Sequence, residues 1–457
     1  YWSDSLRRSI LLDSKADILV YGMAEKSLVE LARRMDGGED IKLIRDLPGT
    51  VVKSDPGSLP EGTILLPEND RLKADRRAYA ESFAVQLKNA DPFSAAPLYE
   101  GYGTNGVLQN PPMQPLSQAE FDRIYELPFR KAPHPRYSEP VPAIEEVRFS
   151  LVSSRGCFGS CSFCALTFHQ GRIIQARSHA SLMHEAEGMV SHPEFKGYIH
   201  DVGGPTANFR HPACAKQQNQ GACTHRNCLF PEPCPSLDAD HGDYIELLRE
   251  LRGIDGVKKV FIRSGIRFDY LLREKEGRFL QELCEHHVSG QLKVAPEHVS
   301  ARVLRAMGKP PHRDYLRFKE RYEKLNKKLG KKQYLVPYFI SSHPGSTLED
   351  AIELALFFKQ QRFIPQQVQD FYPTPGTLST CMYYTGLDPR TMGKIYVPKS
   401  HEEKSMQRAL LQFNRPENHA LAAKALHKAG RGDLIGRGTD CLVPPERKRP
   451  SLQKRRS

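Results

Sequence analysis

From residue 147 onward, short apolar runs alternate regularly with segments of helical spacing. This alternation predicts that each apolar run is a buried strand and that each following segment is a helix. Strands joined by helical crossovers are parallel, and the crossovers are right-handed, so the sheet curls in one direction. The six expected strands are 147–152, 198–202, 257–262, 291–294, 334–340 and 366–371, and the expected helices are 181–190, 244–251, 278–287, 315–329 and 348–360.

Three cysteines, Cys157, Cys161 and Cys164, follow the first expected strand at the spacing C-x-x-x-C-x-x-C. Small residues separate them, so the loop can curl tightly and aim three sulfurs at one point. Three thiolates suit a soft metal, and Cys thiolates hold iron–sulfur clusters. Three ligands for a four-iron cube leave one iron open to bind a substrate. The alternatives are structural zinc, for which His169 is the nearest fourth ligand, and a disulfide, which cannot pair all three thiols.

The cysteine motif, with Phe163 just before its third thiol, resembles the signature of the radical S-adenosylmethionine (SAM) superfamily. Three further stretches resemble the YgiQ family of radical SAM proteins: 203–208 (Gly-Gly-Pro-Thr-Ala-Asn), 262–267 (Ile-Arg-Ser-Gly-Ile-Arg) and 372–377 (Tyr-Pro-Thr-Pro-Gly-Thr). The resemblance runs over nearly the whole chain. It implies an α/β fold built on a partial (β/α)6 radical SAM barrel, which agrees with the six expected strands.

The resemblance also implies the chemistry. Cys157, Cys161 and Cys164 would hold a [4Fe–4S] cluster whose open iron chelates the amino and carboxylate groups of SAM. One electron would then cleave SAM to a 5′-deoxyadenosyl radical, which abstracts hydrogen from a substrate that the sequence does not identify. An electron donor such as flavodoxin or ferredoxin is therefore an expected partner.

In α/β barrels the chemistry lies at the carboxyl ends of the strands. Gly203 and Gly204 follow the second strand, and their lack of a Cβ lets the backbone approach a ligand closely. In the superfamily a Gly-Gly-Glu motif here binds the SAM amino group through its backbone. Pro205 replaces the Glu, which preserves backbone contacts and removes any role of that carboxylate. The alternative is an ordinary tight turn.

Later strand ends provide further candidate SAM ligands. Arg263, Ser264 and Arg267 follow the third strand. Arginine suits bidentate recognition of a carboxylate, such as that of SAM or an acidic substrate, and a salt bridge at the barrel rim is the alternative. Glu297 and Ser300 follow the fourth strand and are candidates for contact with the SAM ribose or adenine.

The last two strand ends suggest an alternative activity. His343 is a candidate proton donor, and Tyr372, Tyr383 and Tyr384 are candidates for lining a substrate cavity, with core packing as the alternative. The text around them resembles tRNA methylthiotransferases, so methylthiotransferase-like modification of RNA or protein is the second hypothesis. A donor cluster would need further upstream cysteines, and residues 1–153 contain none.

A second cysteine group, Cys214, Cys223, Cys228 and Cys234, lies between the second strand and its helix. Four cysteines in an irregular, Pro-containing stretch need a metal to hold them. Either a second, fully ligated [4Fe–4S] cluster or structural zinc would serve. The spacing is not that of a zinc ribbon, which favours iron–sulfur, and free cysteines are the alternative.

The remaining sequence divides into flanking segments around the predicted barrel of 146–385 and its Cys-rich insertion of 211–236. Strand–helix–strand order in 1–70 predicts a parallel sheet, and the resemblance implies the remainder of a flavodoxin-like α/β domain whose start is missing, because the chain opens without Met. Residues 71–145 read as a connector with a long loop over 92–115. The C-terminal segment, 386–446, contains two expected helices, 401–413 and 417–430, and 447–457 is a basic tail that we expect to be disordered.

Composition limits the function class. We expect no signal peptide, and no apolar run is long enough to span a bilayer, so we expect a cytoplasmic protein with no membrane partner. Half of the formal net charge of +12 lies in the tail, which weakens the case for a nucleic-acid groove. The hypothesis from another class is a non-catalytic protein in which both cysteine groups bind zinc and the tail docks a nucleic acid.

Overall fold

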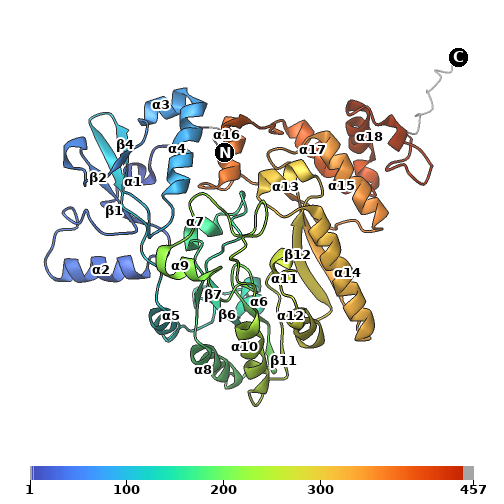
Figure 1. The fold of residues 1–457 in the computed structure, drawn as a ribbon, viewed down its shortest axis with the longest axis horizontal. Coiled ribbons are helices and arrows are strands. Elements are labelled where there is room, and N and C mark those ends of the chain that lie inside the picture. Colours follow the sequence, from blue (N-terminus) through green and yellow to red (C-terminus); the bar gives the residue numbers. More distant parts are fainter. Residues whose placement is uncertain (1–2, 4, 446–457) are drawn as a thin grey trace.

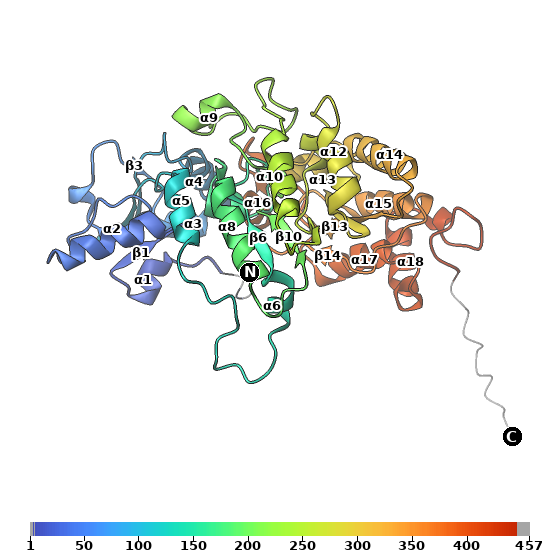
Figure 2. The same cartoon turned by 90° about the horizontal axis from the view of Figure 1, so that it is seen from below.

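The computed structural model describes residue 3 and residues 5–445, so the expected basic tail of 447–457 lies outside the described residues. The N-terminal unit lies at one end of the molecule and helices α17 (His401–Leu411) and α18 (His419–Lys428) lie at the other, with the alternating strands and helices between them (Figures 1 and 2). Within the described part, none of the helices is both long enough and apolar enough to cross a membrane.

The N-terminal unit is a five-stranded sheet in the order β1-β2-β5-β4-β3. Only β3 and β4 pair in parallel, while the other neighbours are antiparallel. The predicted parallel, flavodoxin-like sheet is therefore wrong. Its elements are α1 (Ile10–Ser14), β1 (Ile18–Val20), α2 (Glu25–Asp36), β2 (Thr50–Ser54), β3 (Ile64–Leu65), α3 (Asn69–Ala74), α4 (Arg76–Lys88), β4 (Leu98–Tyr102) and β5 (Asn105–Gln109).

The error has a physical cause in the stretch expected to be a long loop. Tyr102 and Asn105 pair at the end of a hairpin whose two-residue turn contains Gly103 at a φ of +76°. Gly and Asn are residues that a tight hairpin turn requires, so a turn-rich composition was compatible with two paired strands. The N-terminal sheet consequently extends through Gln109.

The six predicted strands of the central unit are confirmed: the first, third and sixth are shorter than expected, the fourth and fifth are longer, and the second is divided into two short strands. All of their pairings are parallel: β6 with β10, β9 with β11, β12 with β13, and β13 with β14. A parallel bridge between Ile266 and Val294 links the end of the third unit to β12. Among the described residues these pairings do not close into a barrel. The strands are β6 (Ser150–Val152), β9 (Tyr198–Ile199), β10 (Asp201–Gly203), β11 (Lys259–Val260), β12 (Gln291–Glu297), β13 (Tyr334–Ser341) and β14 (Gln369–Asp370).

The predicted helices of this unit are also present. They are α8 (His179–Val190), α10 (Gly242–Gly253), α12 (Arg278–Glu282) with a π-helical turn over Leu283–His287, α14 (His312–Lys328) and α15 (Leu348–Gln360). The first strand begins later than expected because Pro142 opens a short helix, α6 (Pro142–Val147), over its predicted start. Strand residues such as Val202 and Val260 are fully buried against Leu248 and Phe279 of the helices, which forms the main hydrophobic core.

The C-terminal segment is helical as predicted. Helices α17 and α18 pack against α15 through a second core. Helix α16 (Leu378–Thr385) instead packs against α4 of the N-terminal unit, nearly 300 residues earlier in the chain, as Figure 1 shows. Phe83 and Ala80 of α4 meet Leu378 and Met382 there, so this contact joins the N-terminal unit to the segment that follows the last central strand.

Candidate active site

The first cysteine loop is fixed at both ends. It runs from β7 (Ser154–Arg155) to α7 (Leu166–Gln170), and β7 pairs antiparallel with β8 (Gln175–Ala176) beyond that helix. Gly156 has a φ of +90°, and a Cβ there would collide with the carbonyl oxygen of Ile173. The loop also donates hydrogen bonds from Cys157 N to Gly171 O (3.0 Å) and from Ser162 N to Met307 O (2.8 Å). The local backbone therefore allows only glycine at position 156 and holds the thiols in one place.

Each thiol environment is set by a different neighbour. Cys157 Sγ lies 3.8 Å from Thr206 Oγ1, and Cys161 Sγ lies 3.3 Å from Arg267 Nη1. Burial raises the pKa of Cys157, with Cys161 adding to the shift. Burial, with Cys161 again adding to it, raises the pKa of Cys164 to about 11. Thiolates are the metal-binding form of cysteine. Because burial raises these thiol pKa values, the positive charge of a bound metal would have to lower them again.

The residues present fit an iron–sulfur cube better than a single ion. The hydroxyls of four serines around the motif are buried without a hydrogen-bond partner: Ser153, Ser154, Ser160 and Ser162. Such groups are rare and need a partner. Within the described residues, no three His, Cys, Asp or Glu side chains converge on one ion position. Cysteines that hold a [4Fe–4S] cluster bind different irons, so their sulfurs need not share one ion.

Arg267 is buried and faces the cluster loop. It forms a bidentate ion pair with Asp269, from Nε to Oδ1 (2.8 Å) and from Nη2 to Oδ2 (2.6 Å), and its third nitrogen faces Cys161. Burial opposes the charge on this guanidinium, but Asp269 and Cys161 outweigh it and keep its pKa raised. Asn208 fixes the Arg267 backbone by accepting from its N (2.8 Å). The side chain predicted to bind a carboxylate therefore already binds one of the protein's own.

The predicted glycine pair lies at the end of β10. A Cβ at Gly203 would lie 2.6 Å from Asp201 Oδ2, and one at Gly204 would lie 2.7 Å from the Ser154 carbonyl oxygen. Close packing against protein therefore explains both glycines without a ligand. Approach of their backbone, or that of Pro205, to SAM remains a prediction.

The two other residues after the third strand have partners within the protein. Ser264 donates from its backbone N to Asp201 Oδ1 (3.0 Å) and from Oγ to Asp201 Oδ2. Arg263 lies at the surface and forms an ion pair with Glu146 (3.2 Å). For Arg263 this is the salt bridge that the sequence analysis gave as the alternative. The three residues thus point to different places, and Arg267 alone of the three has a contact to a motif cysteine.

Glu297 and Lys309 form a buried pair near the cluster loop, with Lys309 Nζ 3.6 Å from Glu297 Oε1. Burial raises the pKa of Glu297, although Lys309 opposes the shift. Lys309 also opposes the raised pKa of Cys164, so the loop has a cation on each side: Arg267 at Cys161 and Lys309 toward Cys164. Ser300 is occupied elsewhere, because its hydroxyl donates to Asp350 Oδ1 (2.6 Å).

The prediction that His343 is a proton donor is wrong. Its Nδ1 lies 2.7 Å from the Pro344 carbonyl oxygen and its Nε2 lies 2.6 Å from Ser379 Oγ, so Nδ1 donates and Nε2 accepts. Burial lowers its pKa to about 3, which keeps the imidazole neutral. Both nitrogens are therefore used in holding two loops together.

The three tyrosine candidates have different surroundings in the structure. Tyr384 packs edge-to-face on Tyr79 (centroids 5.0 Å apart), which confirms the core-packing alternative for this residue. Tyr383 accepts from Lys404 Nζ (3.0 Å) and packs near Phe371. Tyr372 is about half exposed.

A cavity of about 660 Å³ opens over the cluster loop and reaches Cys161. Its wall combines the first cysteine loop, α4, the second cysteine loop and the segment after α16. Four basic residues, Lys88, Arg172, Arg226 and Arg390, line it. An anionic group such as the SAM carboxylate would be attracted to this cavity.

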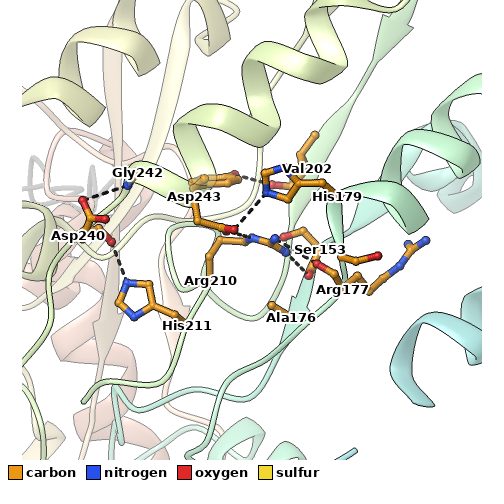
Figure 3. Close-up of polar contacts among 12 residues, drawn as sticks. Ser153, Ala176, Arg177, His179, Val202, Arg210, His211, Asp240, Gly242 and Asp243 are labelled. Carbon is orange, nitrogen blue, oxygen red and sulfur yellow. Dashed lines mark hydrogen bonds and ion pairs between the residues drawn. The ribbon is translucent and has the colours of Figure 1, made fainter. Parts of the chain in front are cut away.

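A buried arginine network supports the carboxyl end of β6 (Figure 3). Arg210 donates to Ser153 O (2.6 Å), to Arg177 O (3.1 Å) and to Asp243 Oδ2 (2.9 Å) at the start of α10. It thereby joins the strand before the cysteine loop to the helix after the second cysteine group. The sequence analysis missed Arg210, Asp201 and Lys309; an acidic residue inside an otherwise apolar predicted strand is the signal that could have found Asp201.

The second cysteine group lies beside the first. Cys223 lines the same cavity as Cys161, and Cys157 and Cys228 pack against one aromatic cluster. The fold thus brings together two cysteine groups that the sequence separates by about 50 residues.

Comparison with known proteins agrees with this description. Residues 1–150 match the family "Radical SAM N-terminal", and residues 366–457 match a domain of unknown function, DUF3362. The chain is similar to the cobalamin-dependent SAM radical enzyme OxsB with aqua-cobalamin bound, at a TM-score of 0.50 and 11% identity over 93% of this chain and 57% of that one, which is a likeness of fold. The match to the family "Radical SAM N-terminal" agrees with the radical SAM assignment made from the sequence.

Curated relatives are much closer in sequence. The chain is 53% identical to a UPF0313 protein of Clostridium perfringens strain 13 over 446 residues, which cover 97% of this chain and 67% of that protein. It is 53% identical to a UPF0313 protein of Clostridium botulinum strain ATCC 19397 over 447 residues, which cover 97% of this chain and 69% of that protein. This chain is therefore a member of the UPF0313 family.

Proposed function

We propose that this chain is a radical SAM enzyme in which Cys157, Cys161 and Cys164 hold a [4Fe–4S] cluster beside the 660 Å³ cavity. The observation that carries the proposal is the three-cysteine loop, fixed at Gly156 and flanked by unpartnered buried hydroxyls. When bound, the cluster supplies the electron that cleaves SAM reductively to a 5′-deoxyadenosyl radical. The parallel strands of the central unit would form the partial barrel that presents this loop.

The protein's own residues would control the charge and the solvent of the site. Arg267 and Lys309 would compensate the negative charge of the thiolates and the cluster. The basic wall of the cavity would attract the SAM carboxylate. Backbone groups of Gly203, Gly204 and Pro205 would form hydrogen bonds with SAM. Packing of α4 on α16 would shield the cavity from water.

The surroundings of the enzyme follow from the same chemistry. The cluster would be reduced by a donor such as flavodoxin or ferredoxin, which remains a prediction. All ten cysteines are free, and an oxygen-sensitive cluster needs a reducing compartment, so we place the enzyme in the cytoplasm.

An anaerobic SAM cleavage assay tests the proposal. The wild type should form 5′-deoxyadenosine with a reductant, and a Cys157→Ala/Cys161→Ala/Cys164→Ala variant should form none above the blank. Cys441→Ala is the matched control, because this thiol lies far along the chain from both groups, near the Asp433 carbonyl oxygen, and should leave the rate unchanged. Equal product from the wild type and the triple variant would refute the proposal.

A further inference from the structure

The second cysteine loop is held by other parts of the protein and has little regular structure of its own. Helix α9 (Ala215–Gln220) is the one helix between β10 and α10 in the described structure. Arg172 donates to Cys223 O (2.6 Å) and to Arg226 O (2.9 Å), and Asp91 accepts from Ala222 N (2.7 Å). The loop is therefore fixed in position between the N-terminal unit and the first cysteine loop.

Amide and cationic N–H groups lie close to two of the four thiols of this loop. Gln217 Nε2 lies 3.6 Å and Arg172 Nη2 lies 4.0 Å from Cys228 Sγ, and Lys216 Nζ lies 3.9 Å from Cys223 Sγ. Amide and cationic N–H groups directed at cysteine sulfurs are typical of iron–sulfur sites, where they tune the reduction potential. Gln217 N also donates to Cys214 O (3.0 Å), and Cys234 N donates to Cys228 O (2.8 Å), so these three cysteines lie close together.

The arrangement favours a cube over zinc. A tetrahedral zinc site would bring four sulfurs about 2.3 Å from one point. Among the described residues, no three possible ligands converge in this way. The thiols of the first cysteine loop, in a chain that matches the Radical SAM N-terminal family, do not converge on one ion position either. A cluster, whose ligands bind separate irons, does not require that convergence.

The two cysteine groups share one aromatic support. Phe158 of the first loop stacks on Phe209 with ring centroids 3.7 Å apart, and Tyr270 packs edge-on against both rings. Cys157 and Cys228 both pack against this cluster. On the open side, Cys161 and Cys223 line the same cavity. A metal group on the second loop would therefore lie next to the SAM site.

We propose that Cys214, Cys223, Cys228 and Cys234 hold a second [4Fe–4S] cluster. With four protein ligands it has no open iron and does not bind SAM, so its role differs from that of the first cluster. The proposal concerns metal binding and does not depend on SAM cleavage.

Metal analysis after anaerobic reconstitution tests this proposal on three proteins. The wild type should contain about eight iron and eight sulfide per chain, and no zinc. The Cys157→Ala/Cys161→Ala/Cys164→Ala variant should keep about four iron, with the low-temperature electron paramagnetic resonance signal of one cluster after reduction. A Cys214→Ser/Cys223→Ser/Cys228→Ser/Cys234→Ser variant should also keep about four. Cys441→Ser is the control and should keep eight.

The triple variant is decisive even if the quadruple variant does not fold, because its second loop is intact. Four iron in the triple variant supports the proposal whether or not the wild type cleaves SAM. No iron in the triple variant, or one zinc per chain in place of the second cluster, would overturn it. Failure of the radical SAM proposal would appear differently, as iron in the wild type without 5′-deoxyadenosine.

Discussion

Arg267 Nη1 lies 3.3 Å from Cys161 Sγ while the same guanidinium forms a bidentate ion pair with Asp269. Both members of the pair are almost completely buried. A buried charge pair contributes little net stability, but removal of one member leaves an uncompensated charge. Arg267 is therefore a positioning residue that links the fold to the first cysteine loop.

Arg267→Gln should lower the free energy of unfolding by about 3–5 kcal/mol, because Asp269 loses its buried partner. It should also lower the cluster reduction potential, since loss of a nearby cation disfavours the more negative reduced state. Anaerobic urea denaturation and a redox titration measure the two effects. Arg263→Gln is the matched control, since its surface pair with Glu146 should contribute about 0–1 kcal/mol. Equal effects of the two substitutions would contradict this role.

Gly156→Ala should abolish binding of the first cluster. The position combines a φ of +90° with a Cβ site that collides with the Ile173 carbonyl oxygen, so the loop must move. Gly38 has nearly the same φ, +89°, but nothing within 4 Å of its Cβ site, so Gly38→Ala carries the conformational strain alone. Iron content after reconstitution should fall by about four per chain in Gly156→Ala and stay unchanged in Gly38→Ala. Full iron in Gly156→Ala would show that the loop tolerates the shift.

The sequence predicted the central unit well because its strands are short apolar runs that alternate with helical patterns, and residues such as Val202 and Val260 are fully buried. Placement of the cysteine loop after the first strand followed from that pattern. The N-terminal sheet was mispredicted because local turn signals do not reveal pairing partners: Val52 pairs with Leu108, which lies 56 residues later. The partner of Arg267 was also hidden, since a single sequence shows that an arginine follows a strand but not that Asp269 folds back onto it.

Asp201 holds the segment after β11 against the glycine pair. It accepts from Arg263 N (2.7 Å) and Ser264 N (3.0 Å). Asp201→Ala should lower the free energy of unfolding by about 1.5–3 kcal/mol, because two backbone donors lose a charged acceptor. Ser264→Ala is the control and should lose about 1 kcal/mol, since the backbone contacts remain.

The same pair of variants examines the SAM site. Because Gly203 packs against the Asp201 carboxylate, Asp201→Ala should also weaken SAM binding, measured by equilibrium dialysis at a temperature where both variants are folded. A variant that loses stability but binds SAM as the wild type does would show that the Gly203 segment makes no contact with SAM.

Three buried histidines and one half-buried histidine should make the protein sensitive to acid. Burial lowers the pKa of His343 to about 3 and the pKa values of His241, His298 and His312 to about 4. Their value in the unfolded chain is about 6.5, so below pH 6.5 the unfolded state binds more protons and stability falls with decreasing pH. This stabilisation is fully present above pH 6.5 and is lost as the pH falls toward 4.

Removal of one such histidine should reduce the slope of the free energy of unfolding against pH. His343→Gln lowers by one the number of extra protons that the unfolded state binds relative to the folded state. Near pH 5 this reduces the pH dependence of the free energy of unfolding by about 1.4 kcal/mol per pH unit. Urea denaturation of the metal-free protein at pH 7.0, 6.0 and 5.0 measures the slope and avoids acid loss of the cluster. His134→Gln is the control, because His134 is exposed in a Pro-flanked turn and accepts from Arg136 N. A slope in His343→Gln equal to that of the wild type would mean that this imidazole is already protonated in the folded state.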